Sequence, residues 1–157
     1  MTRRLFFSAF LCLFLAACTP KHEQIPLFTY DTPTLTLLSA QAHAADLNGK
    51  SPAGEPQKGL YSVADTHSME PILWGGDYIV VTLLEKRPYS GLKVGEVVTY
   101  RADWQSAGAP PVTHRLAQKD KYGWILTGDN TPTYESRWRM TENEYLGTVV
   151  GIYRFKP

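Results

Sequence analysis

The sequence has few cysteines, no cluster of metal-binding side chains and no apolar run long enough to cross a membrane. Cys12 and Cys18 are the two cysteines among 157 residues, which excludes a disulfide-rich scaffold. The four histidines are scattered and no glycine-rich phosphate loop is present, so we expect no metal and no cofactor. Basic and acidic residues nearly cancel, and a formal net charge of +1 gives no electrostatic reason to bind nucleic acid.

The N-terminus has the pattern of a secretory signal. Arg3 and Arg4 precede an uncharged apolar run over residues 5–17, which is far shorter than the roughly 20 residues that a membrane-spanning helix needs. The run ends in Leu-Ala-Ala-Cys, which resembles the lipobox of bacterial lipoproteins, where the cysteine is lipidated and becomes the new N-terminus. Cys18 is therefore the predicted lipidation site. The alternative is an uncleaved run that serves as a hydrophobic anchor.

Lipidation at Cys18 predicts a protein anchored in the bacterial cell envelope, facing the periplasm or the exterior. Loss of the signal peptide, residues 1–17, removes two arginines and changes the formal net charge from +1 to −1. Residues 18–57 contain five prolines and little sustained periodicity, which predicts a tether with one short element near residues 34–45. Within it, the small-x-small pattern Ala-His-Ala of residues 42–44 would permit self-cleavage.

Residues 58–157 remain as a single domain, and short β-type runs predict that it is mainly β. These runs are rich in β-branched and aromatic residues, and turn sequences such as Gly-Gly-Asp at 75–77 separate them. No convincing long helical period interrupts them, so we expect a coiled antiparallel sheet or a partly closed barrel. The predicted strands cover residues 60–64, 78–84, 96–101, 112–117, 124–127 and 145–153.

Three short boxes in this domain carry the residue types of serine-protease chemistry. Residues 68–71 read Ser-Met-Glu-Pro, residues 114–115 read His-Arg, and residues 128–130 read Gly-Asp-Asn. A serine nucleophile needs a base within hydrogen-bond reach, and the base needs a partner that orients it. Each box alone has a structural interpretation, since Ser and Asp are common in turns and a histidine in an apolar strand is most often a packing residue. Their joint occurrence favours the catalytic interpretation.

In this order the boxes resemble those of the signal peptidase I superfamily of serine endopeptidases, over residues 61–153. The resemblance implies a β domain like that of signal peptidase and LexA, with Ser68 as the nucleophile. In that family the residue before the arginine of the second box is lysine in bacterial enzymes and histidine in the archaeal and endoplasmic-reticulum branch. His114 is therefore the implied base, and with an ordinary pKa of about 6.5 it needs less burial than a lysine to act near neutrality.

Two acidic residues compete for the third catalytic position. Asp129 belongs to the Gly-Asp-Asn box, whereas Glu135 stands at the spacing from that box where the histidine branch of the family has its triad aspartate. Glutamate is one methylene longer than that aspartate, so the sequence favours Asp129 over Glu135. For the oxyanion, the resemblance indicates the amide of Ser68 and the hydroxyl of Thr66, two positions before the nucleophile.

The predicted function is that of a membrane-tethered serine endopeptidase, which cleaves exported or membrane-bound precursor polypeptides, or their signal peptides, at small-residue sites through an acyl-enzyme. A related alternative is a peptidase dedicated to one partner, similar to the conjugation-pilin maturation peptidases. A different class of function is a non-catalytic lipoprotein that uses the fold as a binding or scaffold module. A self-cleaving repressor of the LexA type is disfavoured, because the chain carries an export leader in place of a DNA-binding domain.

Overall fold

The computed structural model describes residues 24–131 and 138–156. The predicted signal peptide, Cys18 and Glu135 lie outside these residues. Within them, no helix has the length and apolar character required to span a bilayer. The elements along the chain are β1 (Leu27–Tyr30), α1 (Pro33–Asn48), β2 (Leu60–Ser62), β3 (Tyr78–Leu83), the 3₁₀ turn η1 (Tyr89–Gly91), β4 (Val97–Tyr100), β5 (Val112–Asp120), β6 (Gly123–Thr127) and β7 (Tyr145–Phe155).

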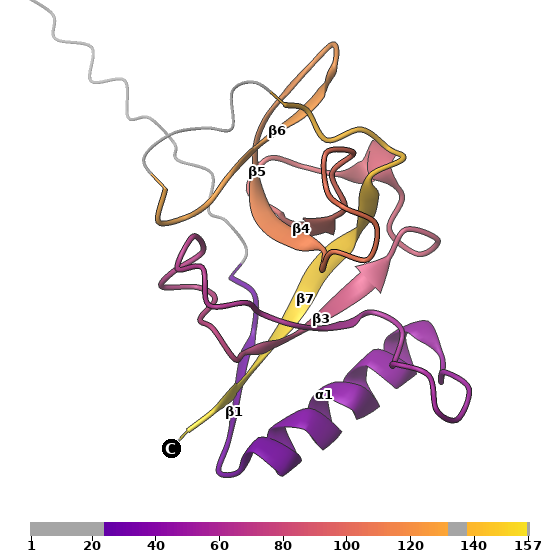
Figure 1. Cartoon of the computed structure of the whole chain (residues 1–157), viewed down its shortest axis with the longest axis vertical. Helices are drawn as coiled ribbons and strands as arrows, with labels where there is room; N and C mark the ends of the chain where they lie inside the picture. Colours follow the sequence, from indigo (N-terminus) through magenta and orange to yellow (C-terminus); the bar gives the residue numbers. More distant parts are fainter. Residues whose placement is uncertain (1–23, 132–137, 157) are drawn as a thin grey trace, which may run out of the picture.

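Seven strands form one sheet in the order β2-β3-β7-β4-β5-β6, with β1 beside the end of β7 (Figure 1). Within the described residues, β1 and β7 pair in parallel and the other strand pairs are antiparallel. The prediction of a mainly β single domain is confirmed. Because β2 and β6 end the strand order without pairing to each other, the sheet is open and does not close into a barrel.

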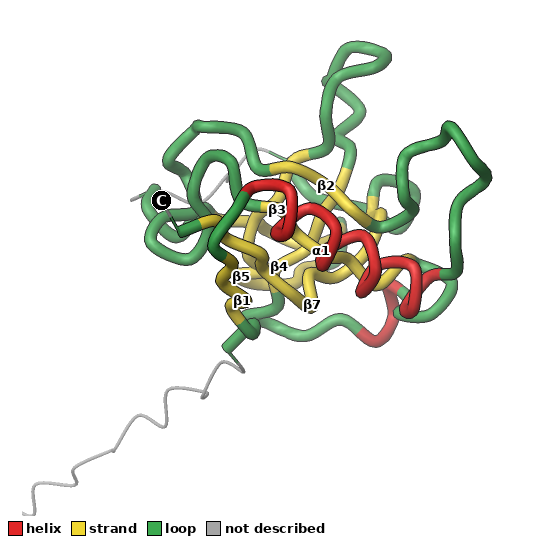
Figure 2. The backbone as a smooth tube through the Cα atoms, turned by 90° about the horizontal axis from the view of Figure 1, so that it is seen from below, coloured by secondary structure: helices red, strands yellow, loops and turns green. Residues whose placement is uncertain are grey.

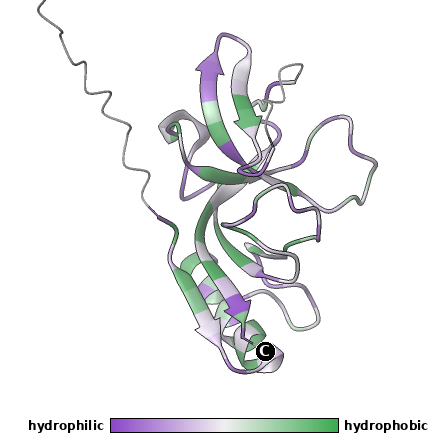
Figure 3. Ribbon diagram, turned by 90° about the vertical axis from the view of Figure 1, so that its left-hand side faces the viewer, coloured by the Kyte–Doolittle hydropathy of each residue, from purple (hydrophilic) through white to green (hydrophobic). Residues whose placement is uncertain are grey.

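The long strand β7 is the centre of the sheet. One of its edges pairs with β3, from Tyr153 opposite Tyr78 to Gly147 opposite Leu83. The other edge pairs first with β4 and then with β1. The crowding explains the glycine at 147, since a Cβ there would collide with the carbonyl oxygen of Thr82. Hydropathy colouring shows apolar residues along these central strands (Figure 3).

Alternation along β4 divides the apolar residues between two clusters, because successive side chains of a strand point to opposite faces of the sheet. Val98 and Tyr100 belong to a cluster that also contains Leu116 of β5 and residues of β6, which we call the hairpin core. Val97, which directly precedes Val98 and points to the other face, packs with Met69 and residues of β3 and β7 in a second cluster, which we call the turn core. The turn core therefore lies on the side of the sheet that holds the residues next to Ser68.

The segment predicted as a tether contains two elements of the folded domain. β1 pairs with β7, and α1 lies across one face of the sheet, over β3 and β7 (Figure 2). The side chain of Thr32 caps α1 by accepting a hydrogen bond from the amide of Leu35 at 3.1 Å, and Gly49 ends the helix with a left-handed φ of 83°. The prediction that residues 18–57 form a tether is therefore wrong for residues 27–48. The one short element that the sequence predicts near residues 34–45 coincides with α1.

The buried face of α1 explains why its packing is hard to predict. It consists of Thr36, Ala40 and Ala44, which are 0–1% exposed, whereas Leu35 and Leu38 are 46% and 57% exposed. A contact stripe of small residues gives almost no hydrophobic periodicity, which is the main sequence signal for a docked helix. The pattern Ala-His-Ala proposed for self-cleavage lies in this helix, and its Ala44 is fully buried against the sheet.

Substitution of Ala44 by leucine tests this packing. We expect Ala44→Leu to lower the free energy of unfolding by about 1–3 kcal/mol, because extra methylenes in a closely packed contact displace neighbouring atoms. Ala42→Leu is the matched control, since residue 42 is exposed on the same helix, and it should change stability little. Chemical denaturation of both variants measures the difference. Equal effects of the two substitutions would contradict the docking of α1 on the sheet.

Candidate active site

Ser68 stands in a tight turn, and Met69, the residue after it, is buried. Met69 is 3% exposed and Leu73 is 2% exposed, and both pack in the turn core, while the amide of Leu73 donates to the carbonyl of Met69 at 2.9 Å. His67, immediately before the serine, has a left-handed φ of 57°, which is uncommon for a residue other than glycine. Ser68 itself is half-buried and borders a groove, while Met69 and Leu73 anchor the turn in the turn core.

The far end of the same turn is fixed by a buried ion pair that sequence reasoning missed. Asp77, which the sequence presents as a turn residue after two glycines, is 3% exposed. Its two carboxylate oxygens accept from Nε and Nη2 of Arg154 on β7 at 2.9 and 2.6 Å, and one of them also accepts from the amide of Trp74 at 2.9 Å. The pairing joins positions 77 residues apart, so no local pattern in the sequence indicates it.

The Gly-Asp-Asn box lies directly against the Ser68 turn. The backbone amide of Asn130 donates to the carbonyl oxygen of Ser68 at 2.9 Å, and its side-chain amide donates to the carbonyl of His67 at 3.0 Å. A Cβ at position 128 would collide with the same Ser68 carbonyl, so the close approach requires glycine. The first and third boxes are thus in contact through hydrogen bonds.

The second box is connected to the third through Arg115. Its Nε and Nη2 donate to the two carboxylate oxygens of Asp129 at 2.7 and 2.6 Å, and its Nη1 donates to the carbonyl of Gly95 at 2.6 Å. Both side chains of the pair are largely buried, with 18% and 14% of their surface exposed. This bidentate pairing gives Asp129 a partner other than His114, so the predicted orienting role of Asp129 is not what this geometry displays. Glu135, the other candidate, lies outside the described residues.

His114 lies on the opposite face of β5 from Arg115. It stands opposite Val98, is 8% exposed, and its Nδ1 is 3.1 Å from the hydroxyl of Tyr100. The hydroxyl of Ser68 is 3.2 Å from that of Thr66. Both Ser68 and His114 are in the described part of the chain, and no hydrogen bond joins them there. His114 thus faces Tyr100 of the hairpin core, and a direct proton transfer from Ser68 requires one of the two side chains to move.

A groove of about 220 Å³ adjoins the Ser68 hydroxyl. Thr66, Met69 and Leu73 line one side of it, and Thr113 of β5 lines the other with the loop that precedes this strand. Gln105 stabilises that loop, because its side chain accepts from the amide of Ala102 at 2.8 Å and donates to the carbonyl of Pro110 at 3.0 Å. The groove is small and largely apolar, which suits a small side chain of a bound polypeptide.

His67 is adjacent to Ser68, but its ring contacts carboxylates. Nδ1 is 2.5 Å from Glu70, and Nε2 is 3.6 Å from Asp65. The hydrogen bond and negative charge of Glu70, and then the charge of Asp65, raise the pKa of the His67 imidazole above its usual value. Both ring nitrogens of His67 thus face carboxylates and not the Ser68 hydroxyl, whose hydrogen-bond partner is Thr66.

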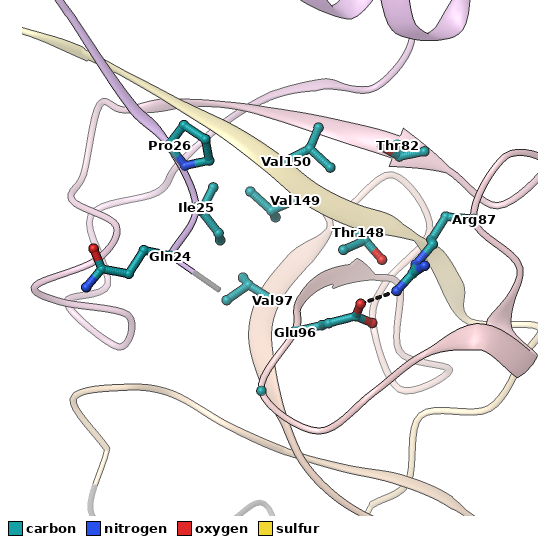
Figure 4. Close-up of a pocket in the computed structure, with 11 residues that line it drawn as sticks. Gln24, Ile25, Pro26, Thr82, Arg87, Glu96, Val97, Thr148, Val149 and Val150 are labelled. Carbon is teal, nitrogen blue, oxygen red and sulfur yellow. Dashed lines mark hydrogen bonds and ion pairs between the residues drawn. The ribbon is translucent and has the colours of Figure 1, made fainter. Parts of the chain in front are cut away.

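A larger cavity, of about 450 Å³, lies beside β7 between the start of β4 and the chain that leads into β1 (Figure 4). The ion pair of Arg87 and Glu96 is at one end, and Ile25, Val97 and Val149 form an apolar wall. None of the predicted catalytic residues lines this cavity. The smaller groove at Ser68 is therefore the candidate active site, although it is not the largest hollow.

No protein-family model matches the chain, and a search among curated proteins finds no match. The described residues also contain no group of three His, Cys, Asp or Glu side chains arranged to hold a metal ion. The functional argument consequently rests on the geometry of the three boxes. The sequence did not indicate the roles of three residues, namely Tyr100, Asp77 and Arg154. Their contacts depend on strand register and long-range pairing.

Proposed function

We propose that this protein is a membrane-tethered serine endopeptidase similar to the signal peptidase I superfamily, with Ser68 as nucleophile and His114 as base. One observation carries the proposal: the three boxes meet in space. Asn130 binds the backbone of the Ser68 turn, and Asp129 binds Arg115, the residue next to His114. If each box had only a local structural role, hydrogen bonds between the boxes would not be expected.

The reaction uses His114 as the proton carrier. Ser68 Oγ attacks the carbonyl carbon of the scissile bond, and its proton passes to Nε2 of His114. The resulting imidazolium donates this proton to the leaving nitrogen as the C–N bond breaks, which leaves an ester on Ser68. Water then attacks the ester and loses a proton to His114, which donates it to Ser68 Oγ as the ester C–O bond breaks and the free acid leaves.

Thr66 and the Ser68 amide are the proposed donors to the oxyanion. The 3.2 Å contact between the Thr66 and Ser68 hydroxyls puts a donor beside the atom that attacks, where the carbonyl oxygen of the substrate becomes negatively charged. Loss of one such donor typically lowers kcat by about 10²–10³-fold. For the orienting residue we retain Asp129 and Glu135 as candidates, and the bond of Asp129 to Arg115 favours a role for Asp129 in holding the loop.

We propose that the protein is anchored in the membrane that also holds its substrates. With lipid on Cys18, only six residues lead to Gln24 at the start of the described chain, and such a segment spans at most about 20 Å. The domain, with its β1 and α1, would therefore stay close to the bilayer and to membrane-bound precursors, which raises their effective concentration. Ile72 and Trp74, in the turn after Ser68, are 37% and 46% exposed, and Ile72 lines a hollow together with Gln24.

A cleavage assay with the lipidated full-length protein in proteoliposomes tests the proposal. Exported precursors with Ala-x-Ala sites are compared with matched precursors whose alanines are changed to phenylalanine. We expect cleavage after the small residues only, and intact-mass analysis of quenched reactions should detect an acyl adduct on the peptide that contains Ser68. A folded protein that cleaves no precursor and forms no adduct would contradict it.

One observation favours the non-catalytic alternative. In the structure the Ser68 hydroxyl contacts Thr66 and not His114, and Asp129 is paired with Arg115. If the protein binds precursors in its groove with equal affinity before and after Ser68 is replaced, and none is cleaved, a binding module becomes the better account.

A further inference from the structure

We propose that Tyr100 is a positioning residue for His114, and that its hydroxyl selects the ring tautomer that can act as base. This inference rests on the proposed function. It concerns a contact on the hairpin-core side of the sheet, away from the Ser68 turn. Tyr100 belongs to none of the three boxes.

The strand register brings the two side chains together. Tyr100 of β4 stands opposite Val112, and His114 is two residues further along β5. Such diagonal neighbours point to the same face, and aromatic side chains are long enough to meet across that separation. The ring centroids are 6.1 Å apart, and the phenol oxygen is 3.1 Å from Nδ1 of His114.

The phenol ring itself has little freedom to move. Tyr100 is fully buried and stacks on Trp138, with ring centroids 5.0 Å apart and an angle of 24° between the planes. A hydroxyl on a ring held in this way occupies a fixed point in the core. It therefore constrains both the orientation of the imidazole and the nitrogen that faces the core.

The direction of the hydrogen bond decides whether His114 can be a base. If the phenol donates to Nδ1, the neutral ring carries its proton on Nε2 and cannot take the proton of Ser68 there. If Nδ1–H donates to the phenol oxygen, Nε2 is unprotonated and can accept a proton. In the second arrangement the phenol oxygen also accepts from the imidazolium that forms during the reaction. We infer that Tyr100 has this acceptor role toward Nδ1, because the proposed base needs an unprotonated Nε2.

The control for Tyr100→Phe is Tyr145→Phe. Tyr145 is a buried tyrosine of the same core, and its hydroxyl is 2.8 Å from that of Thr148. Both substitutions delete a buried hydroxyl that has a hydrogen-bond partner, so similar decreases in Tm are expected. Only Tyr100→Phe removes the contact with His114.

Nitrogen NMR of ¹⁵N-histidine-labelled full-length protein in detergent gives a readout that does not depend on activity. Signals of His114 are assigned by their loss in His114→Gln. At a pH where the ring is neutral, we expect protonated Nδ1 in the wild type and in Tyr145→Phe, and a change toward protonated Nε2 in Tyr100→Phe. In the cleavage assay, Tyr100→Phe should lower kcat by about 10–100-fold with little change in KM, as loss of an orienting partner does elsewhere.

An unchanged His114 tautomer in Tyr100→Phe would overturn the inference, whether or not the enzyme is active. Equal losses of kcat in Tyr100→Phe and Tyr145→Phe would also overturn it, because the effect would then be structural. A wild type that cleaves nothing would refute the proposed function, while the ring assignments would still decide whether Tyr100 sets the tautomer.

Discussion

Replacing Ser68 by alanine is expected to lower kcat/KM for precursor cleavage by about 10⁴–10⁶-fold, because the residual rate comes only from substrate binding and oxyanion donors. His114→Ala should cause a loss of the same order. The two residues act as a unit in the proposed mechanism, so the double variant should be no slower than the slower single variant. Initial rates across a range of precursor concentrations, with cleavage positions read by mass spectrometry, give all three values.

The matched control for this prediction is Ser90→Ala. Ser90 is exposed in η1 and lies outside the groove at Ser68, so its loss should leave the cleavage rate unchanged. Denaturation curves of Ser68→Ala should match those of the wild type, since the serine is only half-buried and the substitution removes a single hydroxyl that borders a groove. Full activity of the Ser68→Ala variant would remove Ser68 from the mechanism. Additive losses in the double variant would separate His114 from the chemistry of Ser68.

The second large effect is on stability. Arg154→Ala is expected to lower the free energy of unfolding by about 3–5 kcal/mol, because it leaves the carboxylate of Asp77 buried without its counterion. Asp77 is 3% exposed at its side chain, whereas Arg154 is 26% exposed. Asp77→Ala should therefore cost less, because the arginine that remains can turn toward water. Urea denaturation at neutral pH measures both values.

Two further variants make this prediction specific. Arg101→Ala removes an exposed arginine next to β4 and should change stability by less than about 0.5 kcal/mol. The double variant Asp77→Ala with Arg154→Ala should be more stable than Arg154→Ala alone, because the unpaired buried charge is gone. If Arg154→Ala and Arg101→Ala have the same small effect, the ion pair does not stabilise the turn that follows Ser68.

These two predictions concern different parts of one arrangement. The Ser68 turn is held on one side by Asp77 and Arg154, and on the other by Asn130 of the Gly-Asp-Asn box. Arg115 then fixes that box to β5 through Asp129. The serine is thus presented by a turn with several independent anchors, as a nucleophile requires if it is to attack with little reorganisation. The proposed base, His114, faces Tyr100 on the other side of β5, so the mechanism requires it to move toward Ser68.

The sequence by itself determined the class of the domain, because the alternation and the turn residues after residue 58 are local signals. Six of the seven strands in the described residues, β2 to β7, overlap the runs predicted from residue 60 onward, whereas β1 falls in the segment predicted as a tether. The three boxes were also visible, since each is a contiguous set of residues with recognisable chemistry. Their membership of a single site could be expected only from their order and from the family resemblance.

Tertiary structure alone decided what these residues contact. α1 docks through Ala40 and Ala44, which carry no periodic apolar signal, so the segment reads as a tether in the sequence. Alternation along β5 puts Arg115 and His114 on opposite faces, where Arg115 bonds Asp129. The register of β4 with β5 then brings Tyr100 to His114. Local patterns specify which residues can form a strand or a turn. The partner of each side chain depends on register and on long-range packing, which the sequence encodes only through the whole fold.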